Sequence, residues 1–204
     1  MSDHRTLDVI ADISRKVDRL VALAAPDQAP NPADQSALLE HIASVSSQLE
    51  EAALHERIIA GAVALSGAER GFLMLLEERG KLRFKAGHGV SQELLLSGRF
   101  DGSSSLIKEV VRGARPILRG PRQDRSPTAS MISGGVDTAL CVPLPPGTRA
   151  HRHSASGMQV AGILYVDSRH PGHKLDQARL ALLERYARHC GIAIENAWLY
   201  AQRS

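Results

Sequence analysis

The most reactive side chains of this sequence are two cysteines, Cys141 and Cys190. A thiol reacts as its thiolate, which forms in a positively charged or helix N-terminal setting. Cys141 stands between Leu140 and Val142 in a run typical of a buried strand, and Cys190 falls on the apolar stripe of the last helical segment. We therefore expect two buried, reduced thiols, and a redox enzyme that uses either cysteine ranks third among the possible functions.

Histidines and hydroxyls offer two further kinds of chemistry. His151 and His153 can share a metal ion, but no nearby Cys, Asp or Glu completes a site, so we predict no metal. Ser103, Ser104 and Ser105 stand at the start of a helical pattern that begins at about Ser104. Hydroxyls and free amides at a helix start either cap the helix or bind an anion.

Two long irregular stretches, 120–137 and 145–159, interrupt the pattern of elements. Loops of this length in a compact domain are typical of lids or binding loops. Arg119 and Asp124 border the first stretch, where they can contact a polar ligand or remain in solvent. The sequence contains no P-loop, nucleophile elbow, dinucleotide fingerprint or metalloprotease helix. We predict a protein that is not an enzyme and uses no cofactor.

Alternating and helical periodicities place the elements around these residues. Helices are expected over 6–24, from about residue 32 to Ser66, over 104–112, and from Asp176 to the end of the chain; strands are expected over 71–76, 82–86, 116–119, 138–144 and 160–167. Gly67 is expected to be the left-handed C-cap of the second helix, and Asp176 the N-cap of the last helix. This order predicts an α+β domain with a mainly antiparallel sheet.

Composition limits the partners and the setting. The chain has 204 residues, which we divide into an N-terminal helix with a Pro-rich linker, 1–30, and one domain, 31–204. The formal net charge is +3, the basic residues are dispersed, and aromatic residues are only 3%, so we predict no nucleic-acid partner. No segment reads as a signal peptide or a membrane span, so we expect no membrane partner and a reducing, cytoplasmic setting.

The ordered set of local sequences resembles one known family. The segments are Gly67-Ala-Glu-Arg-Gly-Phe-Leu-Met-Leu-Leu76, Ser105-Leu-Ile-Lys-Glu-Val-Val-Arg-Gly-Ala-Arg-Pro-Ile-Leu118, Thr138–Leu144, Val160–Asp167 and Ile192–Tyr200. Together they resemble a GAF domain of bacterial signalling proteins, over roughly 36–203. The resemblance implies a GAF/PAS-like six-stranded antiparallel sheet with helices on both faces. It also implies a ligand cavity on one face, and terminal helices on the other that form a dimer bundle.

The resemblance implies two groups of functional residues. The candidate ligand contacts are Ser103, Ser104, Ser105, Arg119, Asp124, Cys141, Tyr165 and Asp167. The candidate homodimer interface is Leu7, Ile10, Val17, Leu20, Leu38, Ile42, Val45, Leu49, Ile194 and Trp198. The cyclic-nucleotide motif of some members aligns with Asp167, Ser168, Leu175, Arg179 and Leu180, none of which matches it, so we do not expect a ligand of that type.

Two non-enzymatic functions remain open. The first is a sensory or regulatory domain of bacterial signal transduction or transcriptional regulation, in which a small molecule or an effector protein biases the packing of the terminal helices. The second is a structural dimerisation scaffold whose cavity is filled by side chains.

Overall fold

A computed structural model of the chain describes residues 31–77, 80–93, 101–120, 135–146, 159–170 and 175–203. The chain divides into two compact units, Met1–Asn31 and Pro32–Ser204, and every element named below belongs to the second. The helix expected over 6–24, with Leu7, Ile10, Val17 and Leu20, lies outside the described residues.

The centre of the second unit is an antiparallel sheet. Its strands are β1 (Arg70–Leu76), β2 (Leu82–His88), β3 (Ile117–Arg119), β4 (Thr138–Leu144) and β5 (Gly162–Ser168), in the order β2-β1-β5-β4-β3. The antiparallel α+β class predicted from the sequence is confirmed. The described residues form five strands, however, whereas the sixth strand was expected from family resemblance and from no pattern of its own.

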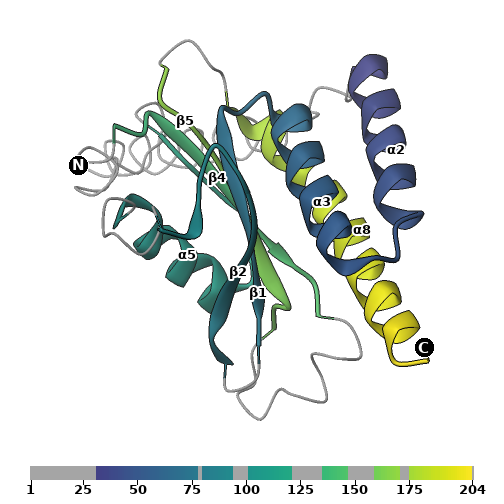
Figure 1. The fold of residues 1–204 in the computed structure, drawn as a ribbon. Coiled ribbons are helices and arrows are strands. Elements are labelled where there is room, and N and C mark those ends of the chain that lie inside the picture. Colours follow the sequence, from purple (N-terminus) through teal and green to yellow (C-terminus); the bar gives the residue numbers. More distant parts are fainter. Residues whose placement is uncertain are drawn as a thin grey trace, which may run out of the picture. The chain divides into compact units, whose positions relative to one another are not determined.

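Helices cover both faces of this sheet (Figure 1). Helix α5 (Asp101–Gly113) packs on one face, against β4 and β5. Helices α3 (Glu51–Ser66) and α8 (Gln177–Ala201) pack on the other face, and α2 (Pro32–Ser46) lies against both of them. The strands therefore separate two layers of different size, a single helix and a group of three.

The sheet is apolar on both faces because both are covered. Successive side chains of a strand point to opposite faces, so in β4 Leu140 and Val142 join the core under α3 and α8, while Ala139 and Cys141 join the core under α5. Strand β5 is buried at all seven of its positions. Its first five residues, 162–166, are apolar, which is typical of a strand covered on both faces, whereas Asp167 and Ser168 at its end are buried polar residues.

The long helix expected to end at Ser66 is two helices in the structure. Residue Glu50 takes an extended conformation, and its carboxylate accepts hydrogen bonds from the backbone N–H groups of Ala52 and Ala53, at 3.0 and 2.7 Å. These bonds start α3 afresh and also lower the pKa of Glu50. Neither glycine nor proline marks the break, so the residue pattern alone read as one helix.

This break folds α2 back onto the domain. Leu38 and Val45 are buried in the core shared with α3 and α8, which differs from their predicted place in a dimer interface. Because α2 is a separate helix, α3 and α8 of the same chain can pack around Leu38 and Val45. Ile42 packs partly buried against that core, Ile194 does so from α8, and Leu49 is exposed at the corner between α2 and α3.

Two predicted helix caps are confirmed. Gly67 has φ +68°, in the left-handed region, and its N–H bonds to the carbonyl of Val63. Asp176 caps α8, and its carboxylate accepts from the N–H of Arg179 at 2.9 Å. Among the described helices, none combines the length and the apolar character that crossing a membrane would require.

Candidate functional site

The α5 face of the sheet carries three charged side chains in one row. In the register of the strands, Arg119 of β3 stands opposite Ala139 of β4, Ala139 opposite Asp167 of β5, and Asp167 opposite Arg70 of β1. The next row along is Ile117, Cys141, Tyr165 and Phe72. Four of the candidate ligand contacts, Arg119, Cys141, Tyr165 and Asp167, are thus brought onto one face in two adjacent rows.

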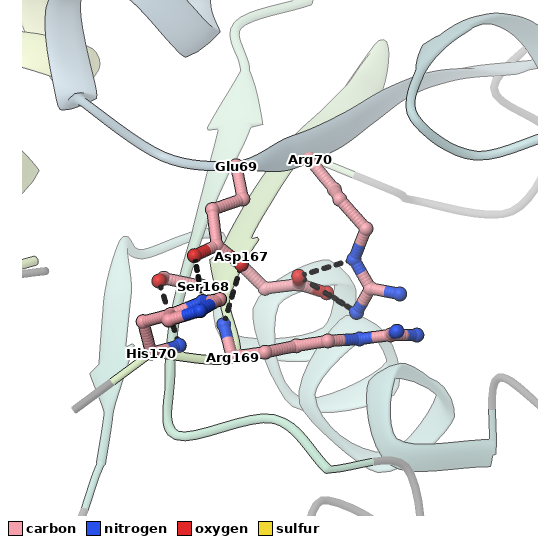
Figure 2. A network of polar contacts seen from close by, with 6 residues as sticks. All are labelled: Glu69, Arg70, Asp167, Ser168, Arg169 and His170. Carbon is pink, nitrogen blue, oxygen red and sulfur yellow. Dashed lines mark hydrogen bonds and ion pairs between the residues drawn. The ribbon is translucent and has the colours of Figure 1, made fainter.

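A buried ion pair closes one end of this row. Arg70 donates from Nε to Oδ1 of Asp167 at 2.8 Å and from Nη2 to Oδ2 at 2.9 Å, a bidentate arrangement that Figure 2 shows. The Asp167 side chain is fully buried. Burial raises the pKa of the Asp167 carboxyl, and the Arg70 guanidinium opposes that rise. The sequence identified Asp167 as a candidate but not Arg70, because only the pairing of β1 with β5 brings the two residues together.

The middle of the α5 face is filled by aromatic rings. Phe72 and Tyr165 stack with centroids 4.7 Å apart and ring planes 19° apart, and both are buried. Burial, followed by the negative charge of Asp167, raises the pKa of Tyr165. Burial also raises the pKa of the Cys141 thiol, so Cys141 stays protonated at neutral pH and is a poor nucleophile.

Arg119 is buried, whereas the sequence left open whether it contacts a polar ligand or remains in solvent. It is 8% exposed and donates from Nη2 to Oε2 of Glu109 on α5, at 2.5 Å. Its Nε is buried and has no hydrogen-bond partner among the described residues. The pair joins β3 to α5 and keeps the guanidinium neutralised beneath the helix.

A second polar cluster lies where β5 ends (Figure 2). The carboxylate of Glu69 contacts Nδ1 of His170 and accepts from the backbone N–H of Arg169 at 3.0 Å. Ser168 accepts from the N–H of His170 at 3.3 Å. The N–H of Glu69 in turn bonds to the carbonyl of Asp167 at 3.1 Å. This cluster fixes the residues that follow β5 to the start of β1, beside the buried ion pair.

The three serines are not arranged as the sequence predicted. Helix α5 begins at Asp101, three residues before the expected start, so Ser104 and Ser105 are inside its first turns. Both side chains are exposed, and they cannot cap a helix that they do not begin. The side chain of Ser103 and all of Asp124 lie outside the described residues.

A cavity whose lining residues the sequence did not predict opens at the other end of α5. It measures about 690 Å³ and is lined by Leu76, Gly80, Leu82, Ile107, Lys108, Val111, Arg112 and Gln159. Four of these residues are two adjacent pairs spaced one turn apart on α5. That spacing was visible in the sequence, but the strand ends that form the opposite wall were not.

The fold agrees with comparison to known proteins. The family model described as "GAF domain" matches residues 48–195. The chain belongs to the GAF domain family, as its local sequences suggested. No curated protein matches the chain significantly.

Several solved structures share the fold. One is the free methionine-R-sulfoxide reductase from Neisseria meningitidis, with 13% identity and TM-score 0.60 over 82% of this chain and 91% of that one. The GAF domain of the Acinetobacter phosphoenolpyruvate-protein phosphotransferase gives 14% identity and TM-score 0.58, over 83% and 96%. The GAF domain of a protein described as a sensor histidine kinase from Pseudomonas syringae pv. tomato has 17% sequence identity and TM-score 0.54. The match covers 83% of this chain and 92% of that one.

Proposed function

We propose that this chain is a non-catalytic regulatory GAF domain in bacterial signal transduction or transcriptional regulation. Its α5 side receives a small molecule or an effector protein, and its other side forms a homodimer. The reductase among the similar structures has the same fold, but both cysteines of this chain are free and buried. A reducing, cytoplasmic setting suits two such thiols.

One observation carries the proposal: β4 and β5 contact helices on both faces. Helix α5 packs on these strands from one side, while α8 packs on β4 and α3 packs on β5 from the other. Adjacent residues of β4 alternate between the two cores, as Leu140 and Cys141 do. Close-packed cores transmit displacement, so a shift of α5 would bias the packing of α3 and α8, as a two-site coupling requires.

The homodimer part rests on the outer surface of α8. Ile192 is 58% exposed and Leu199 is 40% exposed, and their spacing of seven places both on one face of the helix. Tyr200 beside them and Leu39 of α2 are also exposed. Large apolar side chains grouped on helices of one layer are typical of an association surface.

The test begins with the oligomeric state of the natively purified chain. We expect a dimer by light scattering and native mass spectrometry, and a monomer for Ile192→Asp, because a charge in an apolar interface is strongly unfavourable. Ser105→Asp adds the same charge on α5 and is the matched control. A wild-type monomer at high concentration, or a dimer unchanged by Ile192→Asp, would contradict this part.

The scaffold alternative has an observation of its own. The stack of Phe72 on Tyr165 fills the middle of the α5 face, where a domain with an enclosed central cavity would hold its ligand. A dimer that binds no metabolite and whose stability no small molecule increases would favour this alternative.

A further inference from the structure

We propose that the cavity between the second half of α5 and the β1–β2 hairpin binds an apolar carboxylate, with an alkyl or aryl body and one negative head group. This inference rests on the proposed regulatory function and names the ligand class for it. The cavity lies away from the polar row of Arg119, Asp167 and Arg70, and none of those residues lines it.

The walls are suited to a hydrocarbon body. Leu76 and Leu82 come from the facing ends of β1 and β2, and Ile107 and Val111 face them from α5. Small-molecule sites are concave, mostly apolar, and roughly 300–1,000 Å³ in volume. At about 690 Å³ this cavity is within that range. It has room for a chain of several carbons and is too open to hold one by shape alone.

The charge at the cavity specifies the head group. Lys108 and Arg112 are one turn apart on α5, both line the cavity and both are exposed. Across the described part of the chain, neither side chain forms an ion pair or a hydrogen bond. Two cations that have no partner among the described residues, beside an apolar wall, favour an anion with an apolar body.

Neighbouring carboxylates do not compensate these cations. Glu109, the next residue on α5, pairs with Arg119 beneath the helix. Glu77, at the end of β1, pairs with Arg83 and Lys85. Within the described residues, these two acidic groups beside the cavity walls are thus already engaged with other cations.

The helix dipole explains the position of Arg112 but not that of Lys108. Arg112 is in the last turn of α5, where a positive charge stabilises the helix dipole without any ligand. Lys108 is a full turn earlier and has no such role. A guanidinium also offers a planar pair of donors that matches a carboxylate, and Gln159 adds an amide at the same cavity.

The test compares octanoate with 1-octanol, which have the same chain length and differ in charge. Binding to the full chain is measured by calorimetry, and the site is mapped by amide chemical shifts. We expect octanoate to bind and to shift the amides of α5 and the β1–β2 hairpin. In Lys108→Gln/Arg112→Gln its affinity should fall about tenfold or more, the scale of one or two charge-assisted hydrogen bonds.

The control double variant is Arg185→Gln/Arg203→Gln, which makes the same change in net charge at two exposed residues, Arg185 on α8 and Arg203 just after that helix ends. It should change octanoate affinity less than about twofold, as expected for screened, distant charges. The affinity of 1-octanol should be the same in all three proteins. Thermal unfolding of each variant checks that the fold is intact.

Three results would overturn the inference: no octanoate binding at millimolar concentration, equal losses in both double variants, or shifts confined to α2, α3 and α8. None of them bears on the dimer, which is measured without ligand. Conversely, a monomeric chain that binds octanoate as described would refute the coupling and leave the ligand class standing.

Discussion

Replacing Arg70 by methionine is the sharpest perturbation of this fold. The substitution keeps an unbranched apolar stem and removes the guanidinium, so the carboxylate of Asp167 stays buried without its bidentate partner. The result depends on a contact between residues 97 apart in sequence. It therefore tests the strand register as well as the energetics.

The magnitude follows from the geometry. Two unit charges 2.8 Å apart attract by about 6 kcal/mol at an effective dielectric constant of about 20. Much of this attraction offsets the cost of removing both charges from water. Breaking a buried pair by deleting one partner typically costs about 3–5 kcal/mol, and we expect Arg70→Met to lose free energy of unfolding in this range.

The free energy of unfolding that Arg70→Met loses should increase as the pH rises. Burial already raises the pKa of Asp167, and Arg70 opposes that rise, so the variant's folded pKa lies further above the unfolded value. The folded state then binds the proton more tightly than the unfolded state. Stability of the variant is greatest below the unfolded pKa and falls as pH rises through the folded pKa, by up to about 1.4 kcal/mol per pH unit.

The assay is urea unfolding at about pH 5 and about pH 8, where linkage to a raised pKa is measurable. Arg70→Met/Asp167→Val removes both charges and should recover most of the loss and its extra pH dependence. Arg83→Met breaks an exposed pair with Glu77 and should cost less than about 1 kcal/mol. A loss for Arg70→Met no larger than that of Arg83→Met, or equal at both pH values, would refute the reasoning.

Three further predictions concern packing, capping and thiol chemistry. Gly71→Ala would place a Cβ 2.7 Å from the carbonyl oxygen of Tyr165, so we expect a loss of about 1–3 kcal/mol by thermal or urea unfolding; an unchanged midpoint would contradict this packing. Asp176→Ala removes the N-cap of α8 and should cost about 1 kcal/mol, with Asp176→Asn as the conservative control that keeps most of the cap. The thiols of Cys141 and Cys190, whose pKa burial raises, should react with a thiol reagent only after unfolding; rapid labelling of either in the native protein at mildly alkaline pH would show that it is accessible.

Local residue patterns determined much of the fold. The strand 138–144 was predicted with its observed limits, and Gly67 and Asp176 were predicted as helix caps. These features depend on residues adjacent in the chain, through side-chain alternation, a left-handed cap and a hydroxyl or carboxylate facing free amides. For the same reason both cysteines were expected to be buried, and both are.

The break between α2 and α3 shows where local patterns fail. Glu50 is an unusual N-cap, and the apolar spacing across it suits a continuous helix. Two short helices instead bury Leu38 and Val45 against the chain's own α3 and α8. The energy of that burial comes from tertiary contacts, which the pattern of one segment does not contain.

The sequence by itself determined the family, the antiparallel α+β class and which side chains are apolar. Only the tertiary structure decided that Asp167 pairs with Arg70, that Arg119 pairs with Glu109 beneath α5, and that two cations share a cavity with the ends of β1 and β2. The physical reason is range. Helix and strand periodicity is set within a few residues, whereas the neighbours of a side chain across a sheet are set by register and layer packing between distant segments.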